Sequence, residues 1–587
     1  MNVTRLSAFL MLILAVCCVP IITTADSIDN EYEDEATGDV SIDSELVEMS
    51  AEELNNLAGT ALKNGDILAA VNTYQTAMGM YPDDPVAYYN LGFILVDYLL
   101  DTQAGIPLLQ KAVELDPDNG DSWFYLGTAF AIIEDHQSAY DAFQKAVDIN
   151  SKNDAAWYFL GMAAESLGNV DEALKAFNEA LTINPNNPRV LESKGVLLSV
   201  RGEHEEALEV LKRAESNRDP VDPESLIVLF HIGINNLALE NTDLALEAFQ
   251  KVSKMTAQNN LEEGFITTAI YNIGVLQSAA GDTSTAISTL QQAAERSDDP
   301  ATSLLYLGRA YLDEENYSEA IRALNRAIAA DPENGAAYFY LGNALGDIGD
   351  NQGAFDAFIN AVTYDPDNSM AWENLGMILF MQENYIDAAP AFADAVRLNQ
   401  RNGNAWSYFA RTLWYNGDEE GAVEAFNRAF KLIEEPDAIL LNDYGAALND
   451  LGRYTEALDA FDRALALDDS VPDFWFNKGN VLNNLADFER AITAYQKAVS
   501  MDPSPLGYNN IGLLYMRSQD YENALKAFES ALNLNDFLSD VWTNKAQALY
   551  QLERYEEALQ AVESALAVEA FPPAVEFKGI IEEQLAS

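Results

Sequence analysis

The sequence has few of the residues that usually carry chemistry. Among its 587 residues there are two cysteines, Cys17 and Cys18, and three histidines, His136, His204 and His231. The cysteines lie in the first 25 residues and the histidines lie in different parts of the chain, so these residues do not form a Cys–His or zinc-binding pattern. We expect the histidines in turns or on helix surfaces. A Gly-rich phosphate loop and a nucleophile elbow are also absent from the sequence. The sequence therefore predicts a protein that is not an enzyme and that has no cofactor and no metal site.

Basic residues are scarce as well. Lysine and arginine number 33 against 94 aspartates and glutamates, which gives a formal net charge of -61. Such a surface repels phosphate groups, so we expect no nucleic-acid partner and no binding to an anionic membrane surface. Two acidic loops, beginning at Asp116 and Asp365, resemble the start of a calcium loop but lack its glycine at the sixth place and its glutamate at the twelfth. A helix stop at proline and a helix start at Asp or Asn explain both loops better.

The first fifty residues differ from the rest. Residues 1–25 contain one basic residue, Arg5, then an uncharged run from Leu6 to Ile22 and small residues up to Ala25. This pattern predicts an export signal cleaved after Ala25. Because a run of 17 residues lies at the short edge for a spanning helix, an uncleaved membrane anchor is the alternative. Residues 26–50 carry ten acidic residues and no basic one, which predicts a flexible acidic linker.

From residue 51 onward the chain repeats itself. A small residue returns at steps of 33 to 35 residues, apart from one step of 38 and one of 41, and an alanine follows twelve residues after nearly every member. The small residues are Ala58, Gly92, Gly127, Gly161, Gly195, Gly233, Gly274, Gly308, Gly342, Gly376, Ala410, Gly445, Gly479, Gly512, Ala546 and Gly579. A regular period of this length is typical of solenoid proteins.

Each unit reads as two short amphipathic helices. In residues 154–187, Trp157 and Gly161 recur at helical spacing in the first half, and Ala173 and Phe177 do so in the second. Two antiparallel helices approach closely where small side chains meet large ones, and stacked hairpins bury a continuous core. The sequence therefore predicts an all-α solenoid of helix-turn-helix hairpins.

The long steps in the period divide this array. We expect regular units 1–5 over residues 51–221, an irregular unit 6 and joint over 222–266, units 7–15 over 267–572, and a capping helix over 573–587. Pro107 lies inside a predicted helix, where it predicts a kink.

The pattern of Trp157, Leu160-Gly161, Ala173, Phe177, Ala180 and Pro185 resembles the tetratricopeptide repeat family, and the resemblance covers about residues 51–585. It implies a right-handed superhelical solenoid. It further implies that the first helix of each hairpin lines a concave groove, where relatives bind extended peptides or helices. Some relatives grip a terminal carboxylate with a basic clamp, but the lysine that this clamp needs at the fifth place of a unit is missing here.

The first candidate site in this groove is a ladder of asparagines. An Asn amide offers one acceptor oxygen and two donor hydrogens, so a row of them can hold a peptide backbone without reading its side chains. The alternative is that these residues stabilise the hairpins. The ladder residues are Asn477, Asn510 and Asn544, with Asn480, Asn484 and Arg517 nearby by repeat spacing.

A second candidate site lies in two neighbouring units. Methionine and aromatic side chains make an adaptable apolar surface, although core packing is an alternative use for them. The residues are Met377, Phe380, Met381, Arg411, Trp414 and Tyr415.

The prediction for function is a protein–protein interaction scaffold or assembly factor that is exported and secreted or anchored at the cell envelope. Its partners would be proteins or peptides, and any membrane contact would be made through the N-terminal segment alone. The alternative is an accessory subunit that recruits substrate for an envelope enzyme handling glycans or exporting polymers. The sequence predicts no oligomeric state.

Overall fold

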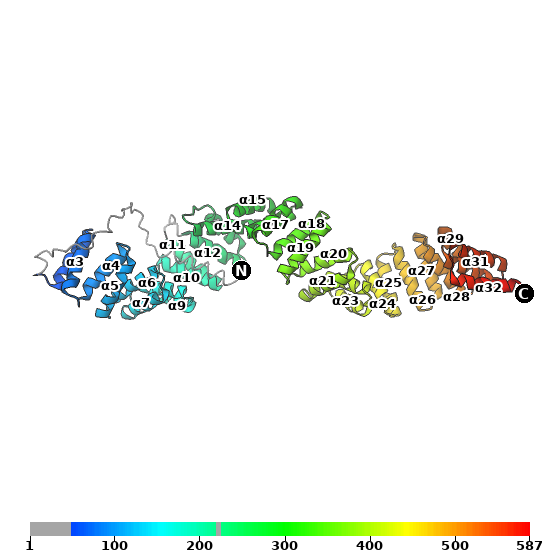
Figure 1. Cartoon of the computed structure of the whole chain (residues 1–587), viewed down its shortest axis with the longest axis horizontal. Coiled ribbons are helices and arrows are strands. Elements are labelled where there is room, and N and C mark those ends of the chain that lie inside the picture. Colours follow the sequence, from blue (N-terminus) through cyan, green and yellow to red (C-terminus); the bar gives the residue numbers. More distant parts are fainter. Residues whose placement is uncertain (1–47, 219–224, 587) are drawn as a thin grey trace. The chain divides into compact units, whose positions relative to one another are not determined.

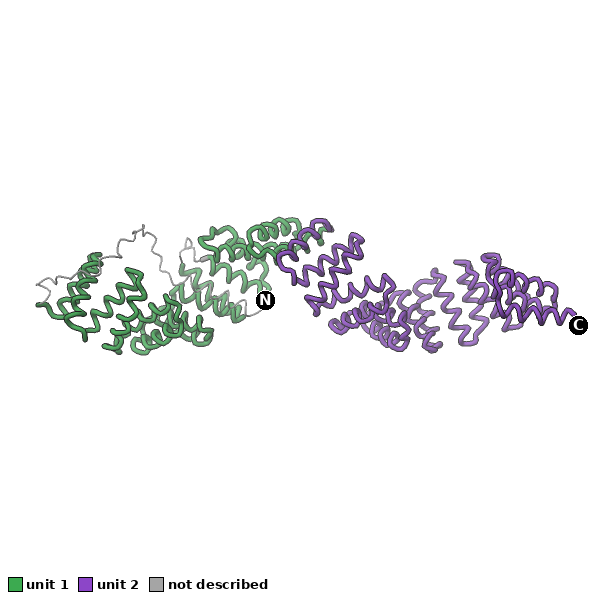
Figure 2. The backbone as a smooth tube through the Cα atoms, in the orientation of Figure 1, with its two compact units in different colours: residues 1–314 green, residues 315–587 purple. Residues whose placement is uncertain are grey.

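The computed structural model describes residues 48–218 and 225–586, which contain 31 α-helices and no β-strand. The prediction of an all-α fold is confirmed. The chain forms two compact units, residues 1–314 and residues 315–587 (Figure 2), and each is described here by itself. The predicted export signal, nearly all of the acidic linker and the beginning of the predicted joint lie outside the described residues.

Unit 1 consists of hairpins that follow one another in sequence order (Figure 1). We call the first helix of a hairpin its A helix and the second its B helix. The A helices of unit 1 are α2 Ala51–Lys63, α4 Pro85–Asp97, α6 Gly120–Ile132, α8 Asp154–Ser166, α10 Pro188–Arg201, α12 Ser225–Ala238, α14 Asn260–Ala279 and α16 Ala301–Asp313. The B helices are α3 Ile67–Met80, α5 Thr102–Leu115, α7 His136–Ile149, α9 Val170–Ile183, α11 His204–Ser216, α13 Thr242–Val252 and α15 Thr283–Arg296.

Unit 2 has the same construction. Its A helices are α18 Gly335–Asp347, α20 Ser369–Met381, α22 Gly403–Tyr415, α24 Ala438–Asp450, α26 Pro472–Asn484, α28 Pro505–Arg517, α30 Ser539–Gln551 and the last helix α32 Pro572–Ala586. Its B helices are α17 Tyr317–Ala330, α19 Asn351–Tyr364, α21 Tyr385–Leu398, α23 Glu419–Leu432, α25 Tyr454–Leu467, α27 Phe488–Met501, α29 Tyr521–Leu534 and α31 Tyr555–Val568.

The acidic and Asn-rich loops start the A helices. The side chain of Asn153 accepts a hydrogen bond from the Ala156 amide at 3.0 Å, and Asn368 does the same for Ala371 at 3.1 Å. These caps satisfy amides that have no partner inside the helix. The loops that resemble calcium loops therefore act as helix starts. No cluster of His, Cys, Asp and Glu able to hold a metal ion occurs in the described part of the chain.

The tryptophan of the repeat has a second role that the sequence did not reveal. The Trp157 indole Nε1 donates to the Ser151 carbonyl oxygen at 3.0 Å, which ties helix α8 to the loop before it. The same bond, spanning six residues, is made by Trp123, Trp372, Trp406, Trp475 and Trp542. Each of these tryptophans thus fixes the connection between one hairpin and the next.

Within a hairpin, the recurring small residues allow the two helices to cross closely. A Cβ atom placed on Gly161 would lie 2.5 Å from Cε1 of Phe177, whose side chain is fully buried. Gly168 adopts a φ of 77° at the turn between the helices, a conformation that glycine takes without strain. The predicted pairing of small and large residues is therefore the packing of the hairpin.

Successive A helices approach each other more closely than successive B helices do, as in α4, α6 and α8 of unit 1 and in α22, α24 and α26 of unit 2. A stack with this difference curves toward its A helices. We call the side of the A helices the inner surface of each unit. The side chains that could receive a partner on a concave face must therefore come from A helices.

The irregular stretch shows its extra residues in helix length. Helix α14 has 20 residues, whereas its predecessor α13 has 11. Helix α5 continues through Pro107 as a single helix. None of the described helices is both long enough and apolar enough to cross a membrane.

Candidate peptide-binding surfaces

The asparagine ladder lies on the inner surface of unit 2, but its members form hydrogen bonds with residues of the neighbouring repeats. Asn477 Nδ2 donates to Asn442 Oδ1 of the preceding A helix at 3.0 Å. Asn544 Nδ2 donates to Asn509 Oδ1 in the same way, also at 3.0 Å. Each of these amides therefore uses one of its donor hydrogens in a bond that connects two repeats. The acceptors, Asn442 and Asn509, are the fifth residues of the preceding A helices and were not among the predicted site residues.

The remaining ladder residues are engaged as well. The Tyr495 hydroxyl donates to Asn480 Oδ1 at 2.6 Å, and Asn510 also hydrogen-bonds with Tyr495. Asn484 Nδ2 donates to Asn449 Oδ1 at 2.9 Å. Arg517 Nη1 donates to Asn483 Oδ1 at 2.8 Å. These contacts support the alternative that the asparagines stabilise the hairpins.

The second candidate site is divided by the structure. Phe380, Tyr385 and Tyr415 form a cluster of rings, with Tyr385 and Tyr415 stacked at a centroid distance of 4.5 Å and Phe380 within 5.9 Å of both. Tyr415 is 51% exposed and Met381 is 73% exposed. We call Phe380, Met381, Tyr385 and Tyr415 the aromatic cluster. It presents an adaptable apolar surface to solvent at the ends of α20 and α22.

The other members of this site serve the packing between repeats. Met377 is half-buried and packs against the core around Phe392. Arg411 Nε donates to Asp443 Oδ2 of α24 at 2.5 Å, and Trp414 Nε1 donates to Asp450 Oδ2 at 2.9 Å. Burial raises the pKa of Asp443, and the charge of the Arg411 guanidinium partly opposes this shift.

The position of His231 differs from the prediction. His231 is buried, whereas it was expected in a turn or on a helix surface. Its Nδ1 lies 3.4 Å from Ser199 Oγ, which accepts a hydrogen bond from Asn235 Nδ2 at 2.8 Å, and His204 Nδ1 lies 2.8 Å from Asn235 Oδ1. Burial lowers the pKa of His231 to about 4, so the ring is neutral at physiological pH. This network joins α10, α11 and α12, a contact that sequence spacing did not reveal.

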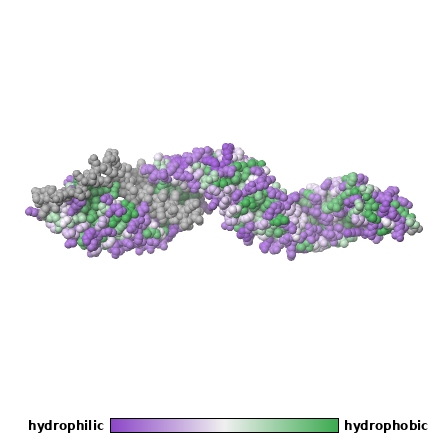
Figure 3. Space-filling model, in the orientation of Figure 1, coloured by the Kyte–Doolittle hydropathy of each residue, from purple (hydrophilic) through white to green (hydrophobic). Residues whose placement is uncertain are grey.

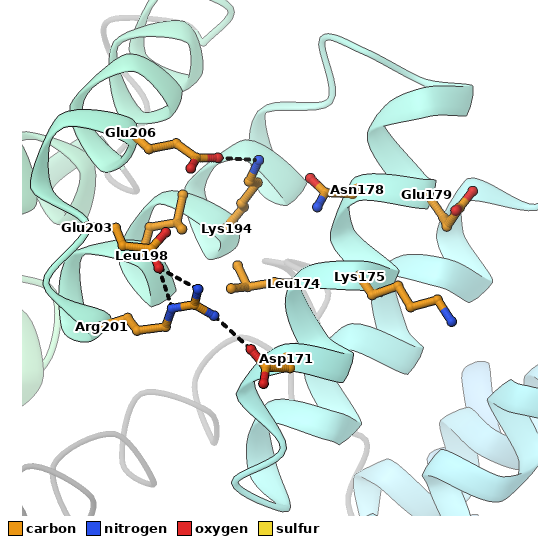
Figure 4. Close-up of a pocket in the computed structure, with 10 residues that line it drawn as sticks. All are labelled: Asp171, Leu174, Lys175, Asn178, Glu179, Lys194, Leu198, Arg201, Glu203 and Glu206. Atoms are coloured by element: carbon orange, nitrogen blue, oxygen red, sulfur yellow. Dashed lines mark hydrogen bonds and ion pairs between the residues drawn. The ribbon is translucent and has the colours of Figure 1, made fainter.

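A recess of about 470 Å³ lies between α9, α10 and α11 (Figure 4). Its charged groups pair within it: Lys194 Nζ lies 3.1 Å from Glu206 Oε1, and Arg201 contacts both Asp171, at 2.8 Å, and Glu203. The cations and carboxylates thus largely neutralise each other. Such an open and internally paired recess offers little to a ligand.

Apolar and polar residues are interspersed over the visible face of each unit (Figure 3). This distribution agrees with a solenoid whose apolar groups face neighbouring helices rather than one large exposed patch.

Solved structures similar to the chain include those of MamA and YrrB. MamA is 26% identical, and the match covers 28% of this chain and 91% of MamA with a TM-score of 0.27. The structure titled "YrrB: a TPR protein with an unusual peptide-binding site" is 23% identical, with coverage of 32% and 95% and a TM-score of 0.29. The Cut9-Hcn1 hetero-tetramer structure is 16% identical, with coverage of 92% and 97% and a TM-score of 0.31. No curated protein sequence is significantly similar to the chain.

Family models described as "Tetratricopeptide repeat" match the chain many times. One matches residues 155–187. Another matches residues 95–155, 271–335, 305–358, 339–405, 382–433, 409–472, 445–505 and 509–575. Together the matches span more than half of the sequence, and they fall on the hairpins described above. The chain therefore belongs to the tetratricopeptide repeat family.

Proposed function

We propose that the protein is a non-enzymatic scaffold or assembly factor that binds extended peptide segments of other proteins along the inner surface of its hairpins. The observation that carries this proposal is the aromatic cluster, because Met381 and Tyr415 leave apolar surface in water beside rings that are already held in place. Rigid, partly exposed aromatic side chains are the usual anchors of protein interfaces. A peptide that covers them gains apolar burial at a small entropic cost to the scaffold.

The hydrogen bonds between repeats support the same function. Bonds such as that between Asn477 and Asn442 fix the spacing of successive A helices, so the inner surface of unit 2 is preorganised. The amides of Asn477 and Asn544 each donate one hydrogen to the neighbouring repeat and keep a second one that can bond to a peptide carbonyl oxygen. The ladder thus contributes to binding as a preorganised polar surface on unit 2.

We further propose that the protein works outside the cytoplasm, at the cell envelope, because residues 1–25 have the pattern of an export signal or anchor. Its partners would then be exported or envelope proteins. The nature of the partners distinguishes a general scaffold from a recruiting subunit of an envelope enzyme.

Crosslinking in living cells tests the proposal. A photoreactive residue is placed at Met381 in the aromatic cluster, and the control places it at Ile359, an exposed apolar residue of the B helix α19. We expect a defined set of envelope proteins to be captured from Met381 but not from Ile359, and the substitution Tyr415→Ala to abolish their capture. Equal, diffuse capture from both positions, or capture that is indifferent to Tyr415→Ala, would show that the aromatic cluster is not a binding surface.

A further inference from the structure

One stretch of the inner surface of unit 1 combines aromatic and acidic residues. Three successive A helices, α4, α6 and α8, contain aromatic residues and four carboxylates but not a single lysine or arginine. The carboxylates are Asp97, Asp121, Asp154 and Glu165. Successive A helices of this unit are neighbours, so the three helices form one stretch of the inner surface. Asp154 differs from the other three carboxylates, since its Oδ2 accepts a hydrogen bond from Asn184 Nδ2 at 3.0 Å.

Aromatic rings connect the three helices. Tyr89 of α4 lies 5.9 Å from Tyr125 of α6, and Phe124 of α6 lies 5.8 Å from Phe159 of α8, measured between ring centroids. Tyr125 also meets Phe93 at 4.7 Å. All five rings are half-buried, so each keeps part of its surface toward solvent. We call these five residues the aromatic strip.

Carboxylates accompany the strip without a partner. Among the described residues, the side chains of Asp97, Asp121 and Glu165 make no hydrogen bond and no ion pair. Asp97 and Asp121 are close enough to Tyr125 for their charges to raise the pKa of its hydroxyl, after the larger effect of burial. Glu165 is half-buried and lies one helical turn beyond Met162 on the face of α8 that also carries Tyr158.

The repeat register shows what Glu165 lacks. In unit 2, the residue at the same place of an A helix bonds to the next A helix: Asn449 accepts from Asn484 at 2.9 Å, and Asn483 accepts from Arg517 at 2.8 Å. In unit 1 the place of the donor is taken by Val200, an apolar residue that is 40% exposed. The next A helix therefore offers Glu165 no hydrogen-bond donor at this place.

We propose that the inner surface of α4, α6 and α8 binds a protein segment that carries arginine or lysine side chains. This proposal rests on the proposed function and specifies the partner for unit 1. A cation over the rings of the aromatic strip is attracted by their π faces, and the unpaired carboxylates accept its hydrogen bonds. Glu165, held among apolar neighbours, is the group that gains most from such a partner.

Two short synthetic peptides provide the test. They share the same apolar and aromatic residues and differ only in carrying either arginines or the uncharged isostere citrulline. Binding of each to the full chain is measured by fluorescence anisotropy at physiological salt. We expect the arginine peptide to bind at least about tenfold more tightly, because charge-assisted hydrogen bonds are the stronger kind.

Matched variants separate a specific site from the general negative charge. Glu165→Gln removes one carboxylate from the inner surface, and Glu172→Gln removes one from an exposed place on the B helix α9. We expect Glu165→Gln to lose about tenfold of the affinity for the arginine peptide and Glu172→Gln to keep it. Circular dichroism confirms that both variants fold.

Equal binding of both peptides, or equal weakening by both substitutions, would overturn the proposal, since either result would leave only unspecific attraction. The outcome is independent of the test at Met381. Partners captured from the aromatic cluster together with failure of the arginine peptide would refute this inference alone. Failure at Met381 would refute the proposed function of that surface even if the arginine peptide binds at unit 1.

Discussion

Replacing Glu165 by glutamine should stabilise the protein, and only above a defined pH. Burial raises the pKa of Glu165 from 4.5 to about 7 in the folded chain. The folded state therefore holds the proton more tightly than the unfolded state, so its stability falls as the pH rises from 4.5 through 7. The shift corresponds to about 3 kcal/mol, which the wild type loses in full above pH 7. Glutamine stays neutral and avoids this loss.

The gain of Glu165→Gln over the wild type should thus be near zero below pH 4.5 and reach about 3 kcal/mol above pH 7. Hydrogen–deuterium exchange of the α8 amides measures the local opening free energy of this hairpin at each pH. Glu172→Gln is the control, because Glu172 is exposed and should give a small difference with no such rise. A gain that is the same at every pH, or equal for both variants, would refute the assignment of Glu165 as a half-buried and unpaired carboxylate.

Two further substitutions test the packing of the array by urea unfolding. Gly161→Ala places a Cβ atom 2.5 Å from the buried Phe177 ring and should lower the free energy of unfolding by about 1–3 kcal/mol. The control Gly264→Ala, with no atom within 4 Å of its Cβ, should raise it by roughly 0.5–1 kcal/mol, and equal effects would contradict the close crossing. Asn477→Ala leaves Asn442 Oδ1 without its bond from the next repeat and should cost about 1 kcal/mol, and an unchanged midpoint would mean that this bond does not tie the repeats.

The construction of each hairpin was predictable from local residues. Trp157, Gly161 and Phe177 recur at spacings that fix one face of each helix, and the structure pairs them as expected. The hydrogen bond from Trp157 to Ser151 was not predictable, because a tryptophan at that place also satisfies the apolar pattern. The indole nitrogen finds its acceptor only when the preceding loop folds back.

The candidate sites were predictable only in part. The positions of Asn477 and Tyr415 on A helices followed from the period, but their partners did not. Asn477 and Glu165 look alike in sequence, as polar residues facing inward from an A helix. Asn477 donates to an amide of the neighbouring repeat, whereas the place that would hold a donor to Glu165 is taken by the apolar Val200.

The sequence by itself thus determined the period, the hairpins and their family, since these depend on side chains a few residues apart along one helix or across one turn. The tertiary structure alone decided which inward-facing polar groups are satisfied. That outcome depends on the register between helices about a whole repeat apart, where a shift by one residue exchanges a hydrogen-bond donor for an apolar side chain. Asn442 received its donor from this register, and Glu165 did not.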